Sequence, residues 1–249
     1  MIDIINIGVN YIIEMVAAWQ YFRSFYSSKC SKQTECMFMV SAYVMMFCLF
    51  WLQIFWFNAV DFLIINCFLC FYLFSRRMSS SVFHALILTV AMVVTEVIIE
   101  LVCMRLLDGF LVFTQNSISY ATVSIGSRIF YYLVIRIIIA VFTPKEERLE
   151  AKSGFTVLLS VTPLMSVWLT LVIVVICMNG HIDFIMGGML LASMALLLVM
   201  NFVVFWAYDS NQKFMRNYLM MQADLKEQQA ETEYYRRLAE QTENQKILI

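Results

Sequence analysis

The sequence contains few of the residues that interrupt helices or carry charge. Its 249 residues include two Pro, seven Gly and two His, and only 14% are Asp, Glu, Lys or Arg. A soluble domain normally has about a quarter of its residues charged. Long apolar stretches with so few breaks are typical of helices that cross a bilayer in about 20 residues. The composition therefore predicts a helical membrane protein.

Signatures of catalysis, metal binding and nucleic-acid binding are missing as well. There is no H-E-x-x-H motif, no G-x-S-x-G motif and no basic patch. Seven Cys is an odd number for a disulfide framework, and the C-x-x-C formed by Cys67 and Cys70 lies in an apolar stretch without a second pair. We therefore expect no metal, no cofactor, no nucleic acid and no catalytic site in this chain.

Seven stretches are apolar enough to be membrane spans in windows of about 19 residues. They cover residues 3–22, 37–55, 58–75, 82–104, 122–142, 155–177 and 184–206. A tight turn at Phe57–Asn58 is expected between the second and third spans. These stretches predict an all-α bundle of about seven transmembrane helices, with six as the alternative number.

The basic residues indicate how the bundle is oriented. The predicted loops on one side of the membrane contain Arg23, Lys29, Lys32, Arg76, Arg77, Lys145, Arg148, Lys152, Lys213 and Arg216. The opposite side contains only Arg105. Cytoplasmic loops carry the excess of Lys and Arg. We therefore expect the N-terminus outside, a transmembrane sensor bundle over residues 1–206, and a cytoplasmic helix over residues 207–249.

Charged residues inside the predicted spans are the candidate functional residues. Each costs about 2.5–3.5 kcal/mol on insertion scales, so such residues are rare unless they have a role. Glu96 and Glu100 share one face of the fourth span, and Arg128 lies in the fifth. Their depths favour a Glu100–Arg128 pair. Together with Asp61 they either line an outward-open ligand pocket or form a structural salt link, and the residues alone leave both open.

The two His carry no role in this interpretation. His181 is expected in a short outer loop and His84 near the inner end of the fourth span. For both, a solvated position is the more common one.

After the last span the chain becomes polar and helix-prone, without Gly or Pro. Steps of four and three from Met221 give a seam of Leu225, Gln228, Thr232, Tyr235, Ala239 and Thr242. A stable coiled coil has apolar residues at nearly all such positions, so this half-polar seam predicts weak pairing. Its apolar members, Met221, Leu225, Tyr235 and Ala239, are the candidates for a dimer contact in a signalling helix.

The segment NYLMMQADLKEQQAETEYYRRLAEQTENQKILI, following several membrane spans, resembles the linker helix of peptide-sensing histidine kinases of the accessory-gene-regulator type, which have an ATPase domain of the GHKL class. The matching elements are Tyr234–Tyr235, Arg236–Arg237 and the closing Ile247–Ile249. In that family a phosphoacceptor motif follows, and this motif and the ATP-binding boxes are absent here. The likeness therefore concerns only a sensor and its linker.

This resemblance implies a two-component quorum-sensing receptor in a bacterial plasma membrane. It implies a homodimer with a cytoplasmic C-terminus and an extracellular peptide or small-molecule signal. The alternatives are a membrane peptidase and a transporter-type subunit with a coiled-coil tail. The peptidase needs a Cys close to an inner-face His, but after His84 the next Cys is Cys103. A transporter would favour an internal repeat and broken helices, and neither is clear in the sequence.

Overall fold

The computed structural model describes residues 2–50, 55–74, 77–106, 117–142, 155–179 and 184–247, and all regular secondary structure within these ranges is helical. The all-α class expected from the composition is therefore confirmed. The helices are α1 (Ile2–Phe25), α2 (Lys32–Phe50), α3 (Phe55–Leu69), the π-helical turn η1 (Cys70–Phe74), α4 (Met78–Leu106), α6 (Ser117–Phe142), α7 (Phe155–Asn179) and α8 (Phe184–Ile247).

Each predicted span coincides largely with one helix, or with α3 and η1 together in the case of the third. The expected turn at Phe57–Asn58 is wrong, because both residues lie inside α3. No Gly or Pro occurs near this dipeptide to end a helix, and an Asn close to a helix N-terminus is well tolerated. The residues that join α2 to α3, 51–54, lie outside the described part of the chain.

Five of the described helices are long and apolar enough to cross a membrane: α2, α4, α6, α7 and a stretch of α8. The apolar segment Asn58–Phe74 is shorter. The predicted first span, in α1, is not among the five, since Asn6, Asn10 and Glu14 interrupt its apolar sequence. By composition the chain is thus compatible with a membrane protein.

The distribution of polarity is the reverse of that in a soluble bundle. Large apolar side chains of α7 such as Leu158 and Trp168 are 66% and 59% exposed, whereas Asn66, Thr89 and Thr170 are fully buried. A soluble monomer rarely exposes apolar surface continuously. Apolar side chains outside and polar side chains between the helices are the arrangement that a lipid surrounding favours.

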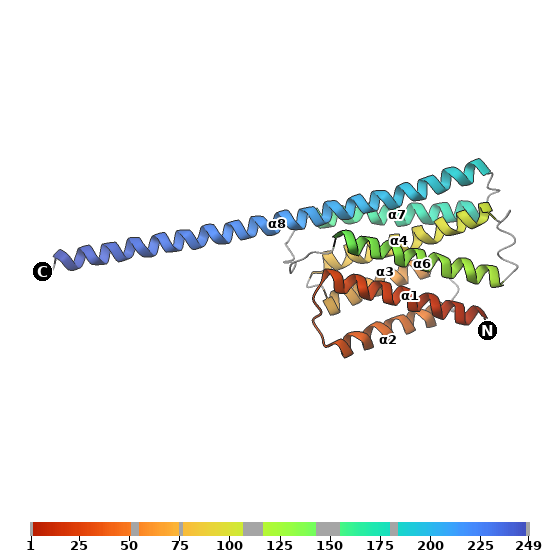
Figure 1. Cartoon of the computed structure of the whole chain (residues 1–249), viewed down its shortest axis with the longest axis horizontal. Helices are drawn as coiled ribbons and strands as arrows, with labels where there is room; N and C mark the ends of the chain where they lie inside the picture. Colours follow the sequence, from red (N-terminus) through yellow and green to blue (C-terminus); the bar gives the residue numbers. More distant parts are fainter. Residues whose placement is uncertain are drawn as a thin grey trace. The chain divides into compact units, whose positions relative to one another are not determined.

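Helix α4 is the centre of the bundle and packs against α3, α6 and α7. In Figure 1 it lies between α6 and α7, and α1 covers α6. Val90, Val94, Val97 and Leu101 recur at intervals of four and three and form a core with Met194 of α8. Phe83 and Ile87 belong to the larger core shared with α1, α3 and α6. Because α4 contributes to both cores, its helix is almost entirely buried from Phe83 to Thr95.

The turn η1 is bound by the connection between α1 and α2. The backbone N–H of Lys29 donates to the carbonyl of Leu73 at 2.9 Å, and its Nζ donates to the carbonyl of Phe71 at 2.7 Å. Wide helical turns and helix ends leave carbonyl groups in need of donors. Lys29 supplies two of them and so joins the end of the α3–η1 segment to the loop after α1.

The chain divides into two compact units, Met1–Tyr208 and Asp209–Ile249. The first contains the helix bundle and the apolar part of α8. The second contains the polar part of α8, whose side chains are exposed at every position from Asn217 to Ala239. The boundary expected from the sequence, between residues 206 and 207, lies two residues from this division.

Candidate functional site

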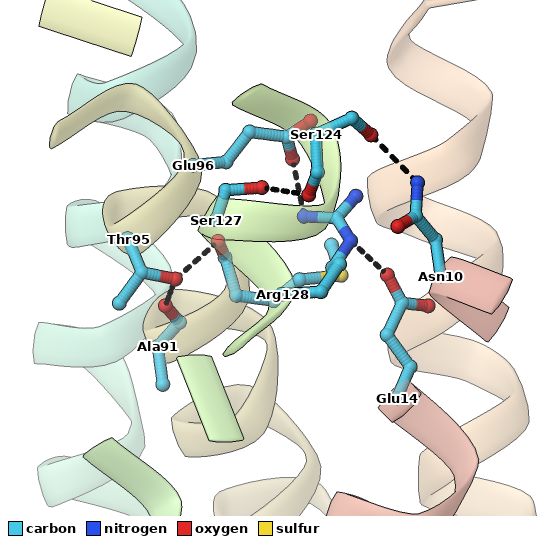
Figure 2. A network of polar contacts seen from close by, with 9 residues as sticks. Asn10, Glu14, Ala91, Thr95, Glu96, Ser124, Ser127 and Arg128 are labelled. Carbon is cyan, nitrogen blue, oxygen red and sulfur yellow. Dashed lines mark hydrogen bonds and ion pairs between the residues drawn. The ribbon is translucent and has the colours of Figure 1, made fainter. Parts of the chain in front are cut away.

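Arg128 of α6 is the centre of a group of charged side chains inside the bundle, which we call the charged cluster: Glu14, Glu96, Glu100 and Arg128. Its Nε lies 2.6 Å from Oε1 of Glu14, and its Nη1 donates to Oε2 of Glu96 at 3.0 Å. The side chains of Arg128 and Glu14 are 12% and 4% exposed, and that of Glu96 is 36% exposed. Figure 2 shows the guanidinium between carboxylates of two different helices.

Small polar residues of α4 and α6 near the charged cluster form hydrogen bonds within their own helices. Ser127 donates to the carbonyl of Ser124 at 2.7 Å, and Thr95 donates to the carbonyl of Ala91 at 2.6 Å (Figure 2). Hydroxyls that bond back to their own helix need no partner across the interface. Short side chains at these positions also allow helices to approach closely, which places the long Arg128 side chain between α1 and α4.

A line of polar contacts continues from this cluster along the interface between α1 and α6. Asn10 Nδ2 donates to Ser124 Oγ at 2.6 Å, and Tyr132 Oη donates to Gln20 Oε1 at 3.0 Å. The more exposed Arg136 reaches the same oxygen of Gln20 at 3.4 Å. Residue numbers increase in the same direction on both helices, so α1 and α6 run parallel. Buried polar contacts at several levels fix the register of one helix against the other.

The expected pairing of Glu100 with Arg128 is wrong. The ion pairs of Arg128 go to Glu14 and Glu96, and Glu100, one turn further along α4, has no hydrogen bond or ion pair within the described residues. The expectation compared depths of two adjacent spans and left out the first span. Glu14 of that span occupies one side of the guanidinium, and Glu96 occupies another.

Sequence reasoning missed Glu14, Asn10 and Ser124 as members of the site. A signal for two of them was present, because Asn6, Asn10 and Glu14 recur at intervals of four and therefore share a face of α1. Asp61 was included in the expected pocket. It lies on α3, partly buried, and no hydrogen bond or ion pair of the described residues joins it to the charged cluster.

A second buried site surrounds His84, and its existence was not expected. His84 is fully buried, so its assignment as a solvated residue is wrong. Six rings have centroids between 5.2 and 5.8 Å from the imidazole, and they belong to Tyr21, Phe25, Tyr26, Phe83, Phe205 and Tyr208. We call this group the His84 cluster. His181 lies outside the described residues.

Hydrogen bonds tie the His84 cluster to three helices. Tyr21 Oη lies 2.7 Å from His84 Nδ1. Ser80 Oγ of α4 lies 2.5 Å from Oη of Tyr26, the residue after α1, and 2.9 Å from Tyr208 Oη of α8. Tyr208 is the last residue of the first unit. The end of the apolar part of α8 is therefore held to α1 and α4 by stacked rings and a buried hydroxyl chain.

The candidate dimer residues lie on the polar part of α8. Met221, Leu225 and Tyr235 are 63%, 48% and 61% exposed, and Ala239 is exposed as well. Phe214 and Tyr218 continue the same intervals of four and three toward the N-terminus of this segment and are 68% and 49% exposed. The seam thus begins with four apolar members before Gln228.

The charged cluster offers carboxylates and a guanidinium, which can hold a charged ligand or each other. Among the described residues no group of three or more His, Cys, Asp or Glu is placed to hold a metal ion.

Comparisons with protein-family models, with curated proteins and with solved structures each gave no match.

Proposed function

We propose that this chain is the membrane sensor module of a two-component histidine kinase, as its linker-like segment suggests. A signal outside the cell, a peptide or another small molecule, binds at the charged cluster and alters how the helices pack around Arg128. Helix α8 carries the change to the cytoplasm. The observation on which this rests most is the helix α8 itself, whose apolar part ends in the His84 cluster at Tyr208 and whose polar part begins at the next residue.

The topology within this proposal has seven spans, an outer N-terminus and a cytoplasmic C-terminus. Parallel packing of α1 and α6 supports it, because the first and fifth spans of such a chain cross in the same direction. The low hydropathy of α1 does not prevent spanning. Asn10 and Glu14 are buried against α6, so their polar groups do not face lipid.

Coupling between the two buried sites follows from the helices that they share. Helices α1 and α4 contribute Glu14 and Glu96 to the charged cluster, and Tyr21 and His84 to the His84 cluster. A shift of α1 against α4 at the first site therefore changes the packing around Tyr208 at the second. A ligand drives this shift only to the extent that it binds one arrangement better than the other.

The proposed active species is a parallel homodimer through the exposed seam of α8. With Tyr218, Leu225, Thr232 and Ala239 at position a, Glu231 falls at position g and Arg236 at position e. In a parallel pair, residue g of one helix meets residue e of the next heptad of the other. Glu231 then faces Arg236 of the second copy. The pair Glu233–Arg237, at 2.7 Å, lies within one helix and outside this seam.

The enclosure of His84 by six aromatic rings argues against the peptidase alternative, for which His84 was the candidate base. The proton on a general base must exchange with substrate or water, and a fully buried imidazole offers no such access.

Photo-crosslinking in the full membrane-embedded chain tests the proposal. Benzoylphenylalanine at position 225 reports on the seam, and the same residue at position 237 reports on the outer surface of α8. We expect a crosslinked dimer from position 225 and not from position 237.

Signal transmission is tested by the same crosslinking. We expect Glu96→Gln, which removes one partner of Arg128, to change the crosslinking yield at position 225 at least twofold. Arg136→Gln, a substitution of an exposed residue on α6, the helix that carries Arg128, is the control. Equal yields with and without Glu96→Gln would contradict signal transmission.

A further inference from the structure

The charged cluster contains more acidic groups than basic ones. Its members provide three carboxylates, Glu14, Glu96 and Glu100, against one guanidinium. Arg128 contacts the first two, and Glu100 has no hydrogen bond or ion pair within the described part of the chain. A carboxylate inside a membrane bundle normally pairs with a cation or a donor. Glu100 therefore offers an unused acceptor at the edge of the cluster.

Two buried amide groups of α1 add to this excess. Asn10 is 8% exposed and Asn6 is 4% exposed, and Oδ1 of each has no hydrogen-bond partner among the residues that the structure describes. In Figure 2 the Asn10 amide nitrogen points to Ser124, and its oxygen lies on the side of Arg128. Asn6 precedes Asn10 by one turn on the same helix face. Buried polar atoms nearly always have a hydrogen-bond partner. Unpaired amide oxygens beside the charged cluster therefore indicate a place where a hydrogen-bond donor can bind.

We infer that the charged cluster binds an organic cation, an ammonium or guanidinium group attached to an apolar body. Such a group brings several N–H donors and the positive charge that the cluster lacks. This inference rests on the proposed receptor function only in treating the bound molecule as a signal, and a cationic amino terminus or a Lys or Arg side chain of a peptide meets the requirement.

An organic cation fits the geometry better than a metal ion does. Metal ions need several ligand atoms converging on one point at short distance. The described residues contain no such group of acidic, His or Cys side chains. The carboxylates are instead spread around the Arg128 side chain on α1 and α4. An ammonium or guanidinium group, with donors pointing in several directions, suits acceptors arranged in this way.

The apolar body of the ligand follows from the surroundings of the cluster. Helices α4 and α6, which supply Glu96 and Arg128, are both apolar enough to span a bilayer. A small hydrated cation loses its water shell on entering such a bundle, whereas a hydrocarbon chain gains from burial. Binding should therefore strengthen with alkyl length among primary ammonium ions.

Hexylammonium chloride is a suitable probe for the purified full chain in detergent. The thermal unfolding midpoint is measured against probe concentration at constant ionic strength, with hexanol, hexanoate and calcium chloride in parallel. We expect a saturable rise of the midpoint with hexylammonium alone. Ethylammonium should bind more weakly. A similar rise with hexanol would show simple apolar binding, and a rise with calcium but not hexylammonium would show a metal site. Either result, or no rise at all, overturns the inference.

Substitutions then locate the binding. Glu100→Gln should weaken hexylammonium binding about tenfold or more, the loss expected when one charge-assisted contact is removed, while Glu233→Gln on the exposed surface of α8 should leave it unchanged. Asn10→Asp, which adds a carboxylate of the same shape, should tighten binding several-fold. Undiminished binding by Glu100→Gln, or weaker binding by Asn10→Asp with a native unfolding midpoint, contradicts the assignment.

Crosslinking at position 225 in the same samples separates this inference from the proposed function. Binding of hexylammonium without any change in crosslinking supports the cation site and counts against transmission through α8. Absence of binding, in a chain whose crosslinking still responds to Glu96→Gln, overturns the cation site and leaves the sensor function standing.

Discussion

At the scale of single residues, the members of the charged cluster are not equivalent. Glu14 is almost completely buried beside Arg128, whereas the side chain of Glu96 is 36% exposed. Breaking a buried ion pair leaves a charge without compensation in a medium of low dielectric constant, but an exposed pair is replaced largely by solvent or lipid headgroups. The shorter contact, at 2.6 Å, also belongs to Glu14. The stability of the bundle should therefore depend more on Glu14 than on Glu96.

We expect Glu14→Gln to lower the free energy of unfolding by about 3 kcal/mol, near the lower end of values for broken buried pairs, because Glu96 still contacts Arg128. Glu96→Gln should cost about 1 kcal/mol or less. Unfolding of the detergent-purified chain, followed by the loss of its monodisperse elution on heating, gives the order of the two midpoints. Arg136→Gln, whose contact with Gln20 is long and exposed, is the control and should lie close to the unchanged chain. A larger loss for Glu96→Gln than for Glu14→Gln would contradict this ranking.

At the scale of helices, the sequence predicted the features that depend on a local pattern of apolar residues, namely the positions of the helices. Long apolar runs located the helices that the structure describes, even where a run contains Gly126 or Pro163, because each helix satisfies its own backbone hydrogen bonds. The turn at Phe57–Asn58 failed because Asn also occurs near helix N-termini, and Phe55 already lies in α3. Contacts between helices could not be predicted in this way. The Glu14–Arg128 pair and the aromatic side chains of the His84 cluster join residues far apart in the chain, so they depend on which helices become neighbours.

The polar part of α8 should form only a weak dimer, because the residues of its seam are apolar before Gln228 and partly polar from Gln228 onward. Gln228→Leu places an apolar residue between Leu225 and Tyr235 and should strengthen the parallel dimer at least about tenfold, since burying one Leu in each copy contributes about 1.5–3 kcal/mol per side chain. Energy transfer between donor-labelled and acceptor-labelled chains, measured as the protein is diluted in lipid vesicles, gives the dissociation constant.

Glu227→Leu is the matched control for that measurement, because it introduces the same side chain one residue away and outside the seam. We expect little change in dimer affinity from it. Equal strengthening by Gln228→Leu and Glu227→Leu would point to nonspecific apolar association instead of a defined seam.

At the scale of the whole molecule, two features argue for opposite locations of the chain ends. An odd number of spans results when α1 is counted, and α1 belongs to the bundle through its contacts with α6. The excess of Lys and Arg in the predicted loops on one side favours a cytoplasmic C-terminus. Leaving α1 at the surface would give six spans and place both ends on the same side, so the two counts differ in a measurable way.

Epitope tags at the two ends distinguish these topologies in the full chain. We expect antibody to reach an N-terminal tag in intact cells freed of their wall, and a C-terminal tag only after the membrane is permeabilised. The physical reason is that Lys213 and Arg216 follow the last span closely and are costly to move across the membrane, while Asp3 and Glu14 provide no such barrier at the other end. Simultaneous access to both tags, or to neither, would remove α1 from the membrane. Access to the C-terminal tag alone would show the opposite orientation. The polar part of α8 would then lie outside the cell, where it cannot contact a cytoplasmic partner.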